Sequence, residues 1–514
     1  MADQQTAFSE QIKNGYTCKG SFFKIGAAML NDDVVPGCDI NLPLKTLNRH
    51  GLIAGATGTG KTKTLQVLAE GLSEAGIPVL LMDIKGDLSG LAAAGAANDA
   101  ITTRSRKIGI DYTPQACPVE LLTLSSEKGA RLRATVSEFG PVLLAKVLGL
   151  NDTQEGIVAL LFKYCDDHRL PLLDLKDFTK VLQYATAEGK AGIEKEYGKI
   201  STASTGTILR KVIELQQQGA DIFFGEKSFE VNDLLRTNTG GQGIVSILRV
   251  TDIQDKPKLF STFMLQMLAE LYATLPEQGD AEKPRLVMFI DEAHLVFKEA
   301  GDALLQQIET VVKLIRSKGV GVFFCTQNPT DIPAPVLSQL GMKIQHALRA
   351  FTAADRKSIK QTAENYPLSD FYKTDALITQ LGIGEALVTL LNEKGIPTPL
   401  AHVMLRAPRS RMDVLSVSEI DALVNASLLT AKYNNSVDAQ SAYEILNGKL
   451  QEAAGQPEEK PVRKNSGDAA PSMLEQLLTS SAARQAGRTA ASVITRSLLG
   501  ALGLGGRSRR KSLF

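Results

Sequence analysis

Residues 51–64 read GLIAGATGTGKTKT and contain the pattern G-x-x-x-x-G-K-T from Gly55 to Thr62. The short apolar run just before the pattern is typical of a buried parallel strand. Apolar residues then recur at helical spacing from Thr62 to Glu74. A strand, a glycine-rich loop and a helix form the setting that a phosphate-binding loop requires. The alternative, a Gly/Thr-rich turn that only caps a helix, explains the motif but not its flanks.

The residue types of this loop suit a nucleotide. Glycines let the backbone turn its N–H groups toward a phosphate, and the helix start adds its dipole. Lys61 can reach the β- and γ-phosphates, and the hydroxyl of Thr62 can bind magnesium. The predicted nucleotide-binding residues are Gly55, Ala56, Thr57, Gly58, Thr59, Gly60, Lys61, Thr62 and Thr64.

A second chemical stretch, RLVMFIDEAHLVF, spans residues 285–297. Its apolar run leads directly into Asp291 and Glu292, which is the Walker B pattern. Asp291 is predicted to bind magnesium together with Thr62. Glu292 is predicted to act as general base on the attacking water. Two interpretations hold for His294: it senses the γ-phosphate, or it packs beside the strand.

Two further apolar runs end in polar side chains. The first ends in Asp83, with Asp87 close behind, and carboxylates at strand ends face the ligand crevice of an open α/β sheet. Either carboxylate could hold magnesium through water or orient the attacking water. Alternatively, Asp87 caps the next turn and Asp83 is a charge at the sheet edge. The second run leads to Gln327, predicted to contact the γ-phosphate and the attacking water, or else to belong to a turn before Pro329.

The composition sets bounds on the class of protein. A chain of 514 residues should contain more than one domain, or one domain with large insertions. The 44% apolar and 22% charged residues are typical of a soluble globular protein, and the net charge of +1 restricts any basic surface to a local patch. The cysteines form no C-x-x-C pair, which argues against a zinc site and a disulfide framework and fits a reducing cytoplasm. We expect no secretory signal and no membrane span.

The apolar periods predict an α/β fold of the P-loop NTPase class, with a mainly parallel sheet. Pieces at 107–110 and 121–124 are strand-like, although the surrounding periodicity is helical. The expected organisation is a β segment at 1–50, the first part of the ATPase core at 51–100, a mainly helical insertion at 101–235, the second part of the core at 236–410, a helical segment at 411–450, and a flexible linker and basic tail at 451–514.

The end of the chain has a distinct composition. Residues 481–514 carry arginines and a lysine, no acidic residue, and apolar positions that suggest an amphipathic helix. This tail could contact nucleic acid, an anionic membrane surface or a neighbouring subunit. The alternative is a mobile, solvated tail.

Four signatures in chain order resemble the HerA and FtsK group of hexameric P-loop ATPases. They are HGLIAGATGTGKT, LMDIKGDLSG, VMFIDEAH, and IRSKGVGVFFCTQNP followed by HALRAFTAADRKSI. The chain looks most like the HerA-like bacterial proteins, over roughly residues 20–405. By that resemblance an arginine of the neighbouring subunit completes the site. Arg316, which follows the Walker B helix, is the first choice, and Arg349 and Arg356 are the runners-up.

The motifs and the resemblance together imply an ATP- and magnesium-dependent hydrolase with a RecA-like core. The resemblance alone implies a homo-oligomeric ring, a hexamer, that acts as a DNA translocase or helicase-like motor. Two other uses of hydrolysis stay open: a motor that remodels protein, and a slow nucleotide-dependent switch without DNA activity. The sequence does not choose among them, because no series of base-stacking aromatic residues and no basic groove can be read from it.

Overall fold

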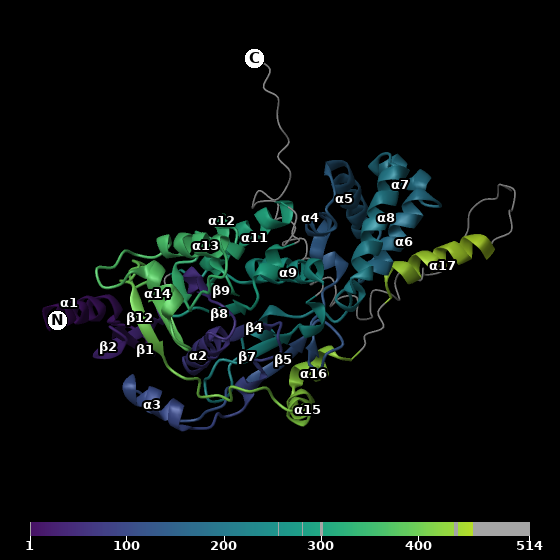
Figure 1. Ribbon diagram of the computed structural model, residues 1–514. Coiled ribbons are helices and arrows are strands. Elements are labelled where there is room, and N and C mark those ends of the chain that lie inside the picture. The colour runs from purple at the N-terminus through teal and green to yellow at the C-terminus, as the bar shows by residue number, and fades with distance from the viewer. Residues whose placement is uncertain (1, 255, 280, 299–301, 436–439, 456–514) are drawn as a thin grey trace, which may run out of the picture. The chain divides into compact units, whose positions relative to one another are not determined.

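The computed structural model describes residues 2–254, 256–279, 281–298, 302–435 and 440–455 (Figure 1). The chain forms two compact units. Unit 1 comprises residues 1–132 and 229–435, and unit 2 comprises residues 133–228 and 436–514. The basic tail expected from the sequence lies outside the described residues.

Unit 1 is built around a mixed β-sheet that, in the described residues, has the strand order β2-β1-β12-β11-β10-β3-β9-β8-β4-β7-β5-β6. Neighbours are antiparallel from β2 to β10 and parallel from β10 to β6. The predicted α/β class with a mainly parallel sheet is confirmed. The strands are β1 (Phe22–Leu30), β2 (Asp33–Pro43), β3 (Gly51–Ala54), β4 (Val79–Asp83), β5 (Val119–Thr123), β6 (Ala130–Arg131), β7 (Val245–Arg249), β8 (Leu286–Ile290), β9 (Val320–Thr326), β10 (Met342–Gln345), β11 (Glu385–Thr389) and β12 (Ala401–Leu405).

The centre of the sheet brings the predicted motifs to one edge. The central strands have the order β10-β3-β9-β8-β4. The strand before the glycine loop, β3, therefore lies between β10 and β9, which both come much later in the chain. Ala54 is paired with Thr326, and Ile290 is paired with both Phe324 and Met82. Because these strands are parallel, their carboxyl ends meet at the same edge, where open α/β sheets bind ligands. We call it the site edge.

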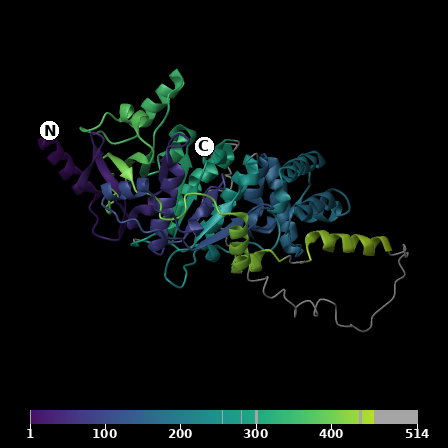
Figure 2. The same ribbon diagram turned by 60° about the horizontal axis from the view of Figure 1, so that its bottom comes forward.

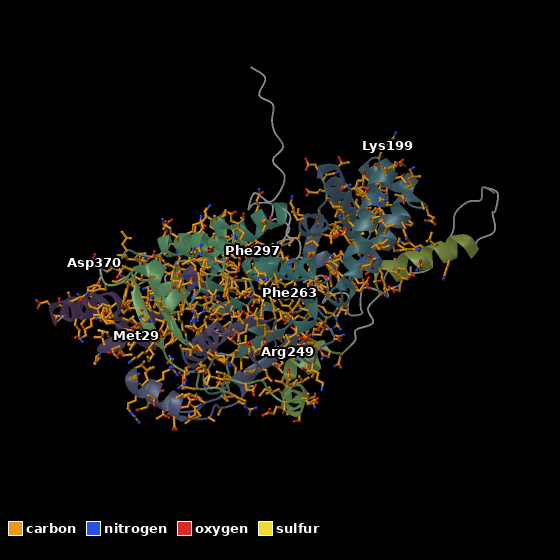
Figure 3. The ribbon with its side chains drawn as sticks, viewed as in Figure 1. Met29, Lys199, Arg249, Phe263, Phe297 and Asp370 are labelled. Carbon is orange, nitrogen blue, oxygen red and sulfur yellow. The ribbon has the colours of Figure 1, made fainter. Side chains whose placement is uncertain are left out.

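Helices cover both faces of the parallel half of this sheet. Figure 1 shows α9 and α11 on one face and α2 on the other. Phe263 of α9 and Phe297 of α10, labelled in Figure 3, are buried, and the Phe297 ring lies 5.7 Å from the ring of Phe324 in β9. The α-helices of unit 1 are α1 (Ala2–Tyr16), α2 (Lys61–Glu74), α3 (Asp99–Lys107), α9 (Pro257–Thr274), α10 (His294–Phe297), α11 (Asp302–Ile315), α12 (Ala334–Leu337), α13 (Ala353–Glu364), α14 (Thr374–Gln380), α15 (Val417–Ala426) and α16 (Leu428–Tyr433). Its 3-10 helices are η1 (Leu44–Arg49), η2 (Ser89–Ala92), η4 (Val231–Leu234), η5 (Thr251–Ile253), η6 (Arg316–Lys318) and η7 (Pro329–Asp331).

Unit 2 is helical, with a core that includes the fully buried rings of Phe139, Phe178 and Phe223. The chain returns to this unit at its end, where the backbone N–H of Tyr443 donates to Asp177 of α6 (2.8 Å). The expected helical segment at 411–450 is therefore divided, with α15 and α16 in unit 1 and α17 in unit 2. The helices of unit 2 are α4 (Val136–Leu148), α5 (Asp152–Asp167), α6 (Leu175–Thr186), α7 (Lys190–Tyr197), α8 (Thr202–Gln217), η3 (Ala220–Ile222) and α17 (Ala442–Gly455).

The N-terminal segment differs from the expected β segment at 1–50, because it begins with the helix α1. Phe8, Ile12 and Tyr16 recur every fourth residue and are buried. Tyr16 also donates its hydroxyl to the carbonyl oxygen of Pro399 (2.7 Å), which ties α1 to the segment between β11 and β12. Figure 2 shows α1 beside the β1–β2 strands. The rest of the expected β segment is present as the antiparallel hairpin of β1 and β2.

The helical insertion also starts later than expected at 101–235, because compact unit 2 takes in only residues 133–228 of that range. The strand-like piece at 121–124 lies in β5, which pairs with β7 and extends the core sheet. The piece at 107–110 is not a strand: it ends helix α3 and turns at Gly109, whose φ is +64°. The pairing of β5 with β7 joins residues far apart in the chain, so local periodicity could not reveal it.

None of the helices in the described part of the chain combines the length and the apolar character needed to cross a membrane.

Candidate nucleotide site

The glycine loop leaves β3 at the site edge and is shaped by its glycines. Gly60, with φ +112°, begins α2, and a Cβ atom there would lie 3.2 Å from the backbone nitrogen of Gly384. Gly58, with φ +79°, faces open space. Lys61 donates its ammonium protons to the carbonyl oxygens of Gly55 (2.5 Å) and Ala56 (3.2 Å). The ammonium therefore lies within the loop that is predicted to surround a phosphate.

His346 supports this loop from beneath, a role that the sequence did not indicate. A Cβ atom on Gly55 would lie 2.5 Å from the Cβ of His346, and the His346 Nε2 lies 2.9 Å from the hydroxyl of Thr64. Next to it, the carbonyl of Ala347 accepts the N–H of Ala56 (2.8 Å). Burial lowers the pKa of His346 to about 4, so the ring is neutral. The signature HALRAF contained this residue, but only the parallel pairing of β10 with β3 gives it a role.

The Walker B carboxylates follow β8 at the same edge. Asp291 and Glu292 are both buried, and Glu292 adopts a left-handed backbone with φ +45°. Burial raises the pKa of Asp291 to about 6. Burial also favours a higher pKa for Glu292, but the Lys85 ammonium, together with His294 and Lys61, more than offsets it, and the pKa of Glu292 stays below its ordinary value. Glu292 is therefore held as the charged form that a general base requires.

Asp83 and Asp87 both lie at the site edge but make different contacts. Asp83 is 1% exposed and accepts the backbone N–H groups of Gly86 (2.7 Å), Asp87 (3.2 Å) and Leu88 (3.1 Å). Asp83 is therefore the residue that fixes the turn, rather than a free charge at the sheet edge. Asp87, for which a magnesium role and a turn cap were both open, accepts the hydroxyl of Thr62 (3.3 Å), and its Oδ1 is buried without a hydrogen-bond partner among the described residues.

Lys85, in the same turn, is the second functional residue that the sequence reading missed. Its ammonium contacts Oε1 of Glu292. Neither oxygen of Glu292 receives a hydrogen bond of good geometry in the part of the chain that is described, so we regard the contact as an ion pair. The signature LMDIKGDLSG contained Lys85, but its partner follows another strand of the sheet.

Two more predicted residues lie at the site edge. His294 Nδ1 is 3.3 Å from Oε2 of Glu292, so this ring contacts the proposed base rather than only packing beside the strand. Gln327 is exposed just after β9, and the carbonyl of the preceding Thr326 accepts the N–H of Gly55 (3.2 Å). Gln327 is thus next to the glycine loop, as a sensor must be.

The three candidate arginines are all exposed but lie at different places. Arg316 begins η6, just before β9 starts. The start of β9 lies at the edge of the sheet opposite the site edge, so Arg316 lies there too. Its charge acts there on His50, the residue before β3. Arg349 follows β10 and donates to the carbonyl of Thr379 (3.1 Å), and Arg356 lies on α13. Arg316 therefore does not complete the site of its own subunit.

The residues at the site edge fit a magnesium ion. Magnesium prefers oxygen ligands and keeps several waters and substrate phosphates in its shell. The hydroxyl of Thr62 and the carboxylates of Asp291 and Asp87 supply such oxygens, and the unpartnered Oδ1 of Asp87 is free to accept a metal-bound water.

Comparison with known proteins gives a family and a fold. The model of the helicase HerA-like C-terminal family matches residues 29–510. The DNA double-strand break repair helicase HerA of Sulfolobus acidocaldarius is 21% identical over 367 residues, which are 71% of this chain and 67% of that protein. The probable helicase MJECL08 of Methanocaldococcus jannaschii is 27% identical over 278 residues, 48% of this chain and 51% of that protein. Among solved structures, the bacterial conjugative coupling protein TrwBdeltaN70 superposes with a TM-score of 0.52 at 15% identity, covering 79% of this chain and 94% of that one.

Proposed function

Because this chain belongs to the helicase HerA-like C-terminal family, we propose that it is a magnesium-dependent ATP hydrolase that moves along DNA as a homo-oligomeric ring. The observation that carries the proposal is the meeting of the glycine loop with Asp291 and Glu292 at one sheet edge. Both motifs follow strands of the same parallel array.

The residues take the following roles. The backbone of residues 55–62 and the ammonium of Lys61 bind the phosphates of ATP. Thr62 and Asp291 hold magnesium, assisted by Asp87, and the ion offsets the charge that develops on the transferring phosphoryl group. Glu292 accepts a proton from the attacking water, and Gln327 orients that water. The charged state and the burial of Glu292 support its assignment.

The ring is supported by the position of the arginines. Arg316 lies at the opposite edge from its own glycine loop, so a catalytic role for Arg316 requires the site of another copy of the chain. Arg349 and Arg356 are the alternatives. An arginine supplied in trans stabilises charge in the transition state and can raise the rate by about a thousandfold or more.

The use of hydrolysis for movement on DNA rests on the family and on its similarity to relatives described as helicases. The test is phosphate release measured with and without double-stranded and single-stranded DNA. We expect DNA to stimulate hydrolysis several-fold in the wild type and to have no effect on Glu292→Gln, which binds ATP but lacks the base. Hydrolysis that ignores DNA at every concentration would contradict the DNA motor and favour a protein-remodelling motor or a slow switch.

A further inference from the structure

The roles proposed above assign no function to Lys85, although it forms an ion pair with Glu292. The Lys85 side chain is 36% exposed, whereas that of Glu292 is 6% exposed. The lysine therefore reaches from a partly exposed position to a carboxylate that is almost closed off from solvent. A general base that is held by an ammonium cannot at the same time accept a proton from water freely.

The turn that carries Lys85 is fixed, so this contact does not depend on a loose loop. Asp83 accepts three backbone N–H groups of the turn, from Gly86, Asp87 and Leu88. Farther along the turn, Asp87 accepts the hydroxyl of Thr62 in the glycine loop. The backbone at Lys85 is thus anchored on one side to the sheet and on the other to the phosphate-binding loop, and only its side chain is free to move.

Lys85 also lies within electrostatic range of the phosphate site. After burial, the charge of Lys85 is the largest influence that lowers the pKa of Lys61, the lysine of the glycine loop. Asp291 and Glu292 act on Lys61 in the opposite direction. Two ammonium groups and two carboxylates therefore share one small region, with Lys61 on the carbonyls of Gly55 and Ala56 and Lys85 on Glu292.

We propose that Lys85 is a positioning residue that exchanges partners during turnover, from the carboxylate of Glu292 to the terminal phosphate of ATP. This inference rests on the proposed ATPase function of the same site. The terminal phosphate offers three oxygens and more negative charge than a carboxylate, so it can compete for the ammonium. ADP lacks that group and leaves Lys85 on Glu292. The base is therefore released only when there is a γ-phosphate to attack.

The exchange predicts a coupling between Lys85 and Glu292 that appears in nucleotide binding, without hydrolysis. Calorimetric titration gives the dissociation constants of ADP and of the non-hydrolysable β,γ-imido analogue of ATP, both with magnesium. The readout is the preference for the ATP analogue over ADP. Glu292→Gln removes the competitor for the ammonium, so it should raise this preference about tenfold when Lys85 is present. In the Lys85→Met background the same substitution should change the preference less than about twofold.

Three variants make the cycle specific. Lys85→Arg keeps the charge and should keep the tenfold effect of Glu292→Gln. Lys85→Gln is a second neutral replacement and should lose it. Lys63→Met removes a charge next to Thr62, but Lys63 donates to the carbonyl of Met412 rather than to Glu292, so in this background the tenfold effect should persist.

The outcomes separate this proposal from the proposed function. An equal effect of Glu292→Gln in the wild-type and Lys85→Met backgrounds would mean that the substitution acts through the loss of the Glu292 charge alone. That result would overturn the exchange and leave the proposed ATPase function intact. A wild-type protein that binds neither nucleotide would overturn the ATPase function and the exchange together. A strong effect confined to backgrounds with a cation at position 85 supports the exchange.

Discussion

At the scale of single residues, Lys61 is the group whose removal should affect binding and leave the fold intact. Its ammonium contacts two loop carbonyls, those of Gly55 and Ala56. Lys61→Ala should therefore abolish tight ATP binding with little change in thermal stability. Calorimetric titration with ATP and a thermal melt check both halves of this prediction. Wild-type hydrolysis by this variant would show that the loop does not bind phosphate.

His346 gives a pH dependence at the same scale. Its pKa is about 4 in the fold, against about 6.5 for histidine in an unfolded chain. The unfolded chain therefore takes up a proton below pH 6.5 that the fold does not, and the free energy of unfolding falls as the pH drops from 6.5 toward 4. The loss from one such histidine is about 1.4 kcal/mol per pH unit.

His346→Gln should reduce this pH dependence, because glutamine does not titrate and can still bond to Thr64. We expect the free energy of unfolding in urea to fall less steeply between pH 6 and pH 5 in the variant than in the wild type. His50 is a second neutral histidine, with a pKa lowered by burial to about 4, and should keep part of the slope. Identical slopes in the two proteins would contradict the neutral, buried ring.

At the scale of elements, a strap formed by residues 406–416 crosses helix α2, and one buried carboxylate makes several of the contacts that hold it. Glu70, 2% exposed, accepts the N–H and the hydroxyl of Ser410 (2.8 and 2.6 Å) and the N–H of Arg409 (3.0 Å). Glu70→Ala leaves these donors without their partner, so it should lower the free energy of unfolding by about 2–4 kcal/mol. Trypsin should then cut at the arginines of the strap.

The matched control is Glu74→Ala, one helical turn away. Glu74 is 39% exposed and pairs with Arg409 at the surface, where an ion pair contributes less than about 1 kcal/mol. Urea unfolding and timed trypsin digestion compare the two variants. Equal stability losses would mean that the strap is not held by Glu70 in particular.

The same scale shows what could be predicted from the sequence. The glycine loop and the Walker B run are local patterns, so their strands and helices followed from periodicity and flanks. The sequence singled out Asp83 and Asp87 as a pair. Which of the two carboxylates holds the turn depends on which backbone N–H groups lie within hydrogen-bonding distance of it, and the sequence does not show this. The contacts of Lys85 with Glu292 and of His346 with Thr64 join residues that follow different strands of the sheet. A local sequence pattern does not determine the order of strands in a sheet, so these contacts could be identified only in the three-dimensional structure.

At the scale of the whole molecule, the proposed action of Arg316 in trans predicts that hydrolysis depends on the assembly. Arg316→Ala subunits should bind ATP without hydrolysing it, and so should Glu292→Gln subunits. Mixing the two should restore part of the activity, because some interfaces regain a native Glu292 beside a native Arg316. Phosphate release in a mixing titration, with light scattering to measure the size of the assembly, checks this. In a confirmed ring, the absence of any gain would move the role to Arg349 or Arg356.

The order of the strands has a consequence for the time course of synthesis. Gly26 of β1 pairs with Leu405 of β12, so β1 cannot pair with β12 until residue 405 has been synthesised. Ribosomes add about 5–20 residues per second, which makes this wait roughly 20 to 75 seconds. Throughout that interval one edge of β1 lacks its native neighbour, and the glycine-loop strand lacks β9 and β10 until residues 320–345 have been made. The nucleotide site of a newly made chain is therefore incomplete until β9 and β10 have been synthesised, long after the glycine loop itself.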